Sequence, residues 1–80
     1  MTTVKQAIHE HDVVALLDPV EKTQDPGKWA AGTVGAVVSD YGDIKLVEIA
    51  NDRGETLDLI QVQELRLRLI AKSAHVQSPA

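Results

Sequence analysis

The sequence predicts an all-β fold, a small antiparallel barrel of about five strands with one long first loop. Short apolar segments recur along the chain, and clusters of Gly, Pro, Asn and Asp separate them. The segments follow one another too closely for parallel strands, because parallel crossovers need a dozen or more residues. We therefore expect an antiparallel meander that closes, or nearly closes, into a barrel.

The first expected strand spans residues 12–17, an apolar run that ends at Asp18-Pro19. Proline offers no N–H to a neighbouring strand and disfavours helix at the residue before it. Residues 18–32 then form a long polar loop with a turn at Asp25-Pro26-Gly27. We expect Trp29, the only tryptophan, to cover one end of the barrel from this loop.

The second and third strands are expected at residues 33–38 and 44–50, joined by a tight turn over residues 40–43. The second strand carries Gly32 and Gly35. They lack the Lys-Ser/Thr and following helix of a phosphate loop, so close backbone packing in a coiled strand explains them better.

A hairpin turn at Asn51-Asp52-Arg53-Gly54 is the strongest turn signal of the chain, because its Asn, Asp and Gly residues tolerate left-handed backbone. The fourth strand, residues 55–60, follows it. Strict alternation places Leu57 and Leu59 toward the core and Asp58 toward solvent.

The last expected strand is residues 65–69, where Leu and Arg alternate, after a 3₁₀ turn within residues 61–65. A short helix remains the alternative, since both residue types favour helices. We assign residues 1–8 to an N-terminal arm, 9–70 to the barrel domain and 71–80 to a flexible tail.

Composition limits the possible functions. The 80 residues allow one domain, and the absence of cysteine excludes disulfides and thiolate metal sites. No apolar run is long enough to span a membrane, and the N-terminus has no signal-peptide pattern, so we expect a cytoplasmic location. A net charge of -4 disfavours phosphate backbones as partners.

Residues with catalytic or metal-binding chemistry are few. His9 and His11 would share one face of a strand and could bind a metal, but a third ligand would have to come from elsewhere, such as His75 or Asp40. The sequence places no nucleophile beside a base. Asp40 and Asp43 flank a turn, and their role in forming that turn accounts for both carboxylates. We therefore expect neither catalysis nor a cofactor.

Nucleic-acid binding is one alternative function. Arg66 and Arg68 would share a face of the last strand, and Lys45 or Lys72 would join them. Binding to single strands also needs aromatic stacking platforms, and the chain offers only Trp29 and Tyr41.

Protein binding is the favoured function. In the registers given above, an apolar patch forms on the outer side of the sheet, typical of an interface; it comprises Leu46, Ile60 and Ile70. The candidate interaction residues are Trp29, Tyr41, Leu46, Ile60, Arg66 and Arg68. A homo-oligomer that forms through this face or through edge strands is expected.

The order of these motifs resembles an uncharacterised bacterial family catalogued as domain of unknown function 4926, an SH3-like small barrel. The shared pattern begins with Asp12-Val13-Val14 and a long loop. Gly32, Gly35, Val37 and Val38 form its Gly-x-x-Gly-x-Val-Val segment. Val47-Glu48-Ile49 precedes the Asn/Asp-rich turn, and Leu65-Arg66 closes the match, which covers roughly residues 9–70.

The resemblance implies an SH3-like fold and no catalytic residues. It also implies a small companion of another protein, of the antitoxin-like kind, whose acidic surface would suit a basic partner. The chain departs from the family pattern around residues 25–29 and in its longer C-terminal end. Metal binding through His9 and His11 remains a second alternative.

Overall fold

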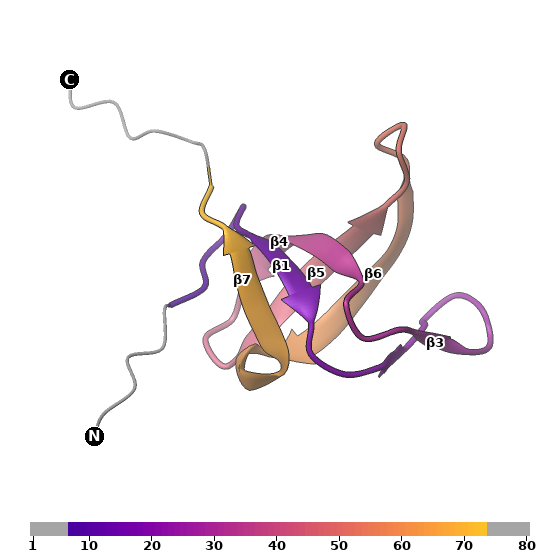
Figure 1. Cartoon of the computed structure of the whole chain (residues 1–80), viewed down its shortest axis with the longest axis horizontal. Coiled ribbons are helices and arrows are strands. Elements are labelled where there is room, and N and C mark those ends of the chain that lie inside the picture. The colour runs from indigo at the N-terminus through magenta and orange to yellow at the C-terminus, as the bar shows by residue number, and fades with distance from the viewer. Residues whose placement is uncertain (1–6, 74–80) are drawn as a thin grey trace.

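The computed structural model describes residues 7–73, which form an all-β domain without an α-helix in that range. Figure 1 shows the strands coiled around a common centre, with the start of β6 on the far side of the sheet from β7 and its end leading through η1 into β7. The elements are β1 (Val13–Leu16), β2 (Val20–Glu21), β3 (Lys28–Trp29), β4 (Val34–Asp40), β5 (Ile44–Ala50), β6 (Thr56–Gln63), the 3₁₀ turn η1 (Glu64–Arg66) and β7 (Leu67–Ala71).

Five strands form one antiparallel sheet in the order β6-β5-β4-β1-β7, which confirms the predicted five-stranded antiparallel architecture. The sheet is open, because β6 and β7 are its two edges and do not pair with each other. The predicted long first loop contains an additional hairpin, β2–β3, of two residues per strand. Alternation cannot reveal strands this short.

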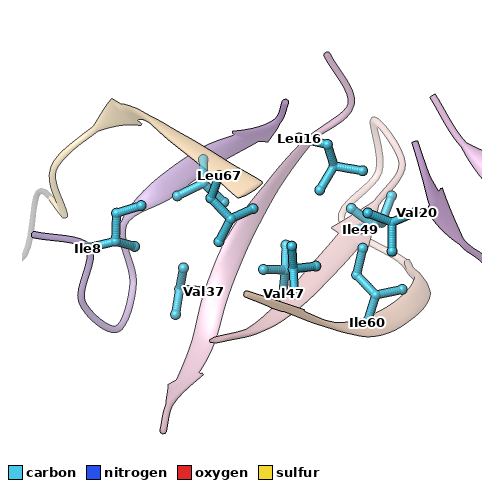
Figure 2. Close-up of a cluster of buried hydrophobic side chains, with 10 residues drawn as sticks. Ile8, Leu16, Val20, Val37, Val47, Ile49, Ile60 and Leu67 are labelled. Carbon is cyan, nitrogen blue, oxygen red and sulfur yellow. The ribbon is translucent and has the colours of Figure 1, made fainter. Parts of the chain in front are cut away.

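The core lies on the concave side of the sheet and is entirely aliphatic. Figure 2 shows branched aliphatic side chains pointing toward one another; they come from β1, β2, β4, β5, β6 and β7 and from the segment before β1. The buried cluster comprises Ile8, Val14, Leu16, Val20, Val37, Val47, Ile49, Ile60, Val62 and Leu67. Ile8, in the segment assigned to the N-terminal arm, is thus part of the core.

Gly35 is required by close packing between β4 and β5. A Cβ at this position would lie 2.6 Å from Val47 Cγ1 and 2.7 Å from the Glu48 carbonyl oxygen. A side chain there would push the two strands apart. This supports the interpretation of Gly35 as a packing residue. The same interpretation is wrong for Gly32, which precedes β4 with φ 90° and would have open space around a Cβ, so its backbone conformation and not packing favours glycine there.

The predicted orientation of the fourth strand is wrong. In β6 the side chains of Asp58, Ile60 and Val62 are buried, whereas Leu57 and Leu59 are 46% and 45% exposed. Ile60, expected on the outer face, is 1% exposed. Asp58 occupies a position in the inward row of β6 where an apolar residue is expected. Hydrophobic alternation therefore assigned the two faces of this strand the wrong way round.

The last described element, β7, is a strand, so the predicted strand is confirmed over the alternative helix, although it spans Leu67–Ala71 rather than residues 65–69. A 3₁₀ turn precedes it at Glu64–Arg66, overlapping only the end of the expected range 61–65, because residues 61–63 continue β6. Beyond β7, Lys72 Nζ and the Ser73 N–H donate to the buried carboxylate of Asp12 at 3.0 and 2.8 Å. The predicted flexibility of residues 74–80 lies outside the described residues. No helix of the described residues is long and apolar enough to cross a membrane.

Candidate interaction surface

The buried carboxylate of Asp58 fixes the long first loop against β6. Its Oδ2 accepts from the Thr23 backbone N–H and the Trp29 indole Nε1–H, both at 2.9 Å. Its Oδ1 accepts from the Thr23 hydroxyl and, at 2.9 Å, from the Leu59 N–H. One side chain of β6 therefore sets the position of the β2–β3 hairpin.

These donors also determine the ionisation of Asp58. Burial alone would raise its pKa, but the hydrogen bonds from Thr23 and Trp29 favour the carboxylate and hold the pKa below its ordinary value. The group is thus a satisfied anion at neutral pH. A buried carboxylate with four donors has a structural role and needs no ligand to satisfy it.

Trp29 is half-buried and packs against the aliphatic core, as expected for a residue that covers one end of it. Its ring carries the Lys22 ammonium 4.6 Å from the centroid, within the range of a cation–π interaction. The indole N–H of Trp29 is therefore hydrogen-bonded to Asp58, and one face of the ring is in contact with Lys22.

A groove runs along the free edge of β6. Its walls come from β6 and the neighbouring β5 on one side and from the start of the long loop and η1 on the other; the lining residues are Val20, Glu21, Thr23, Leu46, Leu59, Ile60, Gln61 and Arg66. Its location, between the edge strand and β2, corresponds to the opening of the sheet.

The two edges of the sheet differ in charge and length. The edge strand β7 has five residues, carries the exposed Arg68 and is followed by Lys72. The edge strand β6 has eight residues, and its exposed positions carry no charge; they are Thr56, Leu57, Leu59, Gln61 and Gln63. Proteins usually protect edge strands with charges or by keeping them short. Only β7 has these features.

The outer face of β5 and β6 carries apolar side chains and one carboxylate, that of Glu48. Leu46, half-buried on β5, pairs with Gln61, and Glu48 pairs with Leu59. The Glu48 carboxylate is engaged by the Thr56 hydroxyl on the same face. Leu46, Leu57 and Leu59 are hereafter called the leucine face.

The structure brings together some of the predicted interaction residues. Leu46 and Arg66 line the groove, and Ile60 contributes to its floor although its side chain is buried. Tyr41 is 62% exposed in the β4–β5 turn. The remaining residue, Arg68, is exposed on the opposite edge strand.

The leucines at the edge were missed as surface residues. The signal that could have identified them is the continuation of the strand to Val62: Ile60 and Val62 form one apolar row at a spacing of two, which leaves Leu57 and Leu59 on the other side.

The proposed basic cluster is not present around Lys45. Lys45 is 3% exposed, and its ammonium donates to Asp40 Oδ1 and, at 2.7 Å, to the Gly42 carbonyl. Burial would lower its pKa, but Asp40 and Glu64 outweigh this effect and raise the pKa above its ordinary value. Lys45 is therefore an internal cation.

Two further residues of the expected cluster, Arg66 and Lys72, are also paired with carboxylates. Arg66 donates through Nε to Asp18 Oδ1 at 2.9 Å and through Nη2 to the Pro19 carbonyl at 2.9 Å. Lys72 is bound to Asp12. The positive charges of Lys45, Arg66 and Lys72 are therefore each paired with a different carboxylate and do not form one basic face.

His9 and His11 do not lie on a strand, so their expected common strand face is absent. The segment turns at residues 10–11, and His11 takes a left-handed backbone with φ 74°. Within residues 7–73 no group of three or more His, Asp or Glu side chains is arranged to hold a metal. His75 lies outside the described residues.

The described residues form a small all-β domain with an open five-stranded antiparallel sheet and a short hairpin. The chain belongs to the DUF4926 family, described as a domain of unknown function, whose sequence profile matches residues 10–69. No curated protein and no solved structure matches the chain.

Proposed function

We propose that the domain is an SH3-like, non-enzymatic protein-binding module that acts by strand addition at β6. An extended segment of a partner would pair with the free edge of β6 and place alternate side chains on the leucine face. Main-chain hydrogen bonds supply affinity in this mode of recognition, and side-chain contacts supply specificity. The carrying observation is the eight-residue edge strand without exposed charge beside a groove.

The SH3-like part of the proposal rests on strand order and curvature. In the sheet, β1 lies between β4 and β7. The loop that contains the β2–β3 hairpin is held next to β6 by the hydrogen bond from the Thr23 N–H to Asp58. Pairing between the edge strands β6 and β7 would complete a barrel. The groove shows where the ring of strands is open.

The biological setting is part of the same proposal. A small accessory protein of the cytoplasm, or an antitoxin-like companion, fits a chain with a net charge of -4 and no cysteine. Nucleic-acid binding has weaker support, because Lys45 is buried and Arg66 is neutralised by Asp18.

The test compares two matched substitutions in affinity purification from the native cell. Leu59→Lys places a charge on the β6 edge, and Ile70→Lys places one on β7 at a position of similar exposure, 42% against 45%. We expect bound proteins to be lost from the Leu59→Lys bait and retained by the Ile70→Lys bait. The same bound proteins at equal amounts on both baits would refute binding at β6.

A further inference from the structure

The uncharged edge of β6 has the properties of a surface that pairs with itself. Resting on the proposed function, we propose that the partner strand is β6 of a second copy of this chain, antiparallel across a two-fold axis. The two open sheets would then join into one continuous sheet of ten strands, five from each copy.

Charge is the first argument for a second copy. Each chain carries a net charge of -4, so two copies repel each other overall, and like charges within the contact surface would add to this repulsion. In a two-fold interface each residue near the axis faces itself or a close neighbour. The exposed row of β6, formed by Leu57, Leu59, Gln61 and Gln63, has no charge to oppose its copy.

The second argument is the matching of faces. Antiparallel pairing across a two-fold axis perpendicular to the sheet sets opposite each other residues that point to the same face. An axis at Leu59 sets Leu57 opposite Gln61, and an axis at Ile60 sets Leu59 opposite Gln61. Either register keeps both leucine faces on one side, where they form a joint apolar surface.

The only charged residue of β6 does not oppose this pairing. Asp58 points into the molecule, where Thr23 and Trp29 hold its carboxylate. Its 3% exposure leaves it screened from a strand on the outer edge. The edge β7, with Arg68 exposed, would instead place like charges near each other in a two-fold pair.

The first experiment measures mass in solution by light scattering and sedimentation equilibrium with the purified full chain. We expect wild type and Ile70→Lys to show twice the 8.7 kDa of one chain. Leu59→Lys should show 8.7 kDa with an unchanged circular dichroism spectrum. The two lysines would face each other for an axis at Leu59 and would be diagonal neighbours on one face for an axis at Ile60, and like charges repel in both arrangements. A wild-type monomer at the highest soluble concentration would overturn the proposal, as would a dimer that Leu59→Lys leaves intact.

The second experiment determines the contact directly. The chain has no cysteine, so a single introduced cysteine reports only on contact between copies. Leu59→Cys should cross-link to itself for an axis at Leu59, and to Gln61→Cys in a mixture for an axis at Ile60, because opposed Cβ atoms of a strand pair approach the spacing of a disulfide. Ile70→Cys is the control. Cross-linking no faster than this control in both cases would overturn the β6 pairing.

The failure of this inference is distinguishable from that of the proposed function. A monomeric wild type whose bound proteins are lost on Leu59→Lys would overturn self-pairing and leave β6 as the docking edge for another protein. A dimer insensitive to Leu59→Lys, with bound proteins equally insensitive, would overturn both.

Discussion

At the scale of single residues, Asp58 connects the two walls of the groove, the edge strand β6 and the long first loop. Its carboxylate belongs to the edge strand, and its donors belong to the loop that forms the opposite wall of the groove. Loss of its charge would leave buried donors without an acceptor. Such donors cost more free energy than the net gain of an average hydrogen bond.

We predict that Asp58→Asn lowers the free energy of unfolding by about 2 kcal/mol, because the amide cannot accept from both sides of the network. Urea unfolding followed by fluorescence of Trp29, the only tryptophan, measures both stability and the environment of the indole. Asp52→Asn, in the exposed β5–β6 turn, is the matched control. An effect of equal size in the control would contradict the assigned role of Asp58.

At the scale of elements, β6 is defined by two rows of side chains with opposite roles. The inward row of Asp58, Ile60 and Val62 holds the loop and fills the core. The outward row supplies the leucine face. Stability and binding should therefore respond to different rows of the same strand.

We predict that Ile60→Ala destabilises the fold by about 3 kcal/mol, the range for removing a buried aliphatic side chain. Leu59→Ala, at the adjacent exposed position, should change stability by less than about 1 kcal/mol in the monomer. Chemical denaturation at low protein concentration measures both. The opposite ranking would mean that Leu59 faces the core and Ile60 the surface.

Local chemistry was sufficient to predict most strands and turns. In the β5–β6 turn, Asn51 Oδ1 accepts from the Arg53 and Glu55 N–H groups, as the Asn-rich turn implies. In β5, Val47 and Ile49 point inward around Glu48, as alternation predicts. The turn and the alternation both depend on residues close together in the chain, so the sequence alone is enough to predict them.

The burial of charged residues could not be predicted from the sequence, because it depends on partners that only the fold brings close. Asp58 and Lys45 are charged and were expected to be exposed, yet both are buried because partners that are distant in sequence or across a turn satisfy them. Asp58 alone reversed the predicted faces of β6. The candidate surface was misplaced for this reason, whereas the strand itself was found.

At the scale of the whole molecule, three charged residues are buried among the described residues: Asp12, Lys45 and Asp58. Burial would raise the pKa of Asp12, but hydrogen bonds from His9, Lys72 and Ser73 hold it below its ordinary value. Asp58 is shifted in the same direction. Both carboxylates therefore stabilise the fold only when ionised.

We predict that acid destabilises the protein from about pH 4 downward, the ordinary pKa of unfolded aspartate. The contribution of Asp12 and Asp58 is complete above that value and is lost as the pH falls through their lowered folded pKa values. Urea midpoints measured between pH 6 and pH 2 test this. Asp58→Asn should show a shallower decline than wild type; parallel curves would contradict the role of its ionisation.

The contacts of Lys72 bring the two ends of the described domain together. Its ammonium donates to the Ala7 carbonyl at 3.2 Å and to Asp12, beside β7, while β6 forms the other edge of the sheet (Figure 1). Entry and exit points this close allow a domain to be inserted into a surface loop of a host protein. A host loop joined to residues 7 and 73 would therefore lie near β7 and leave β6 at the other edge of the sheet.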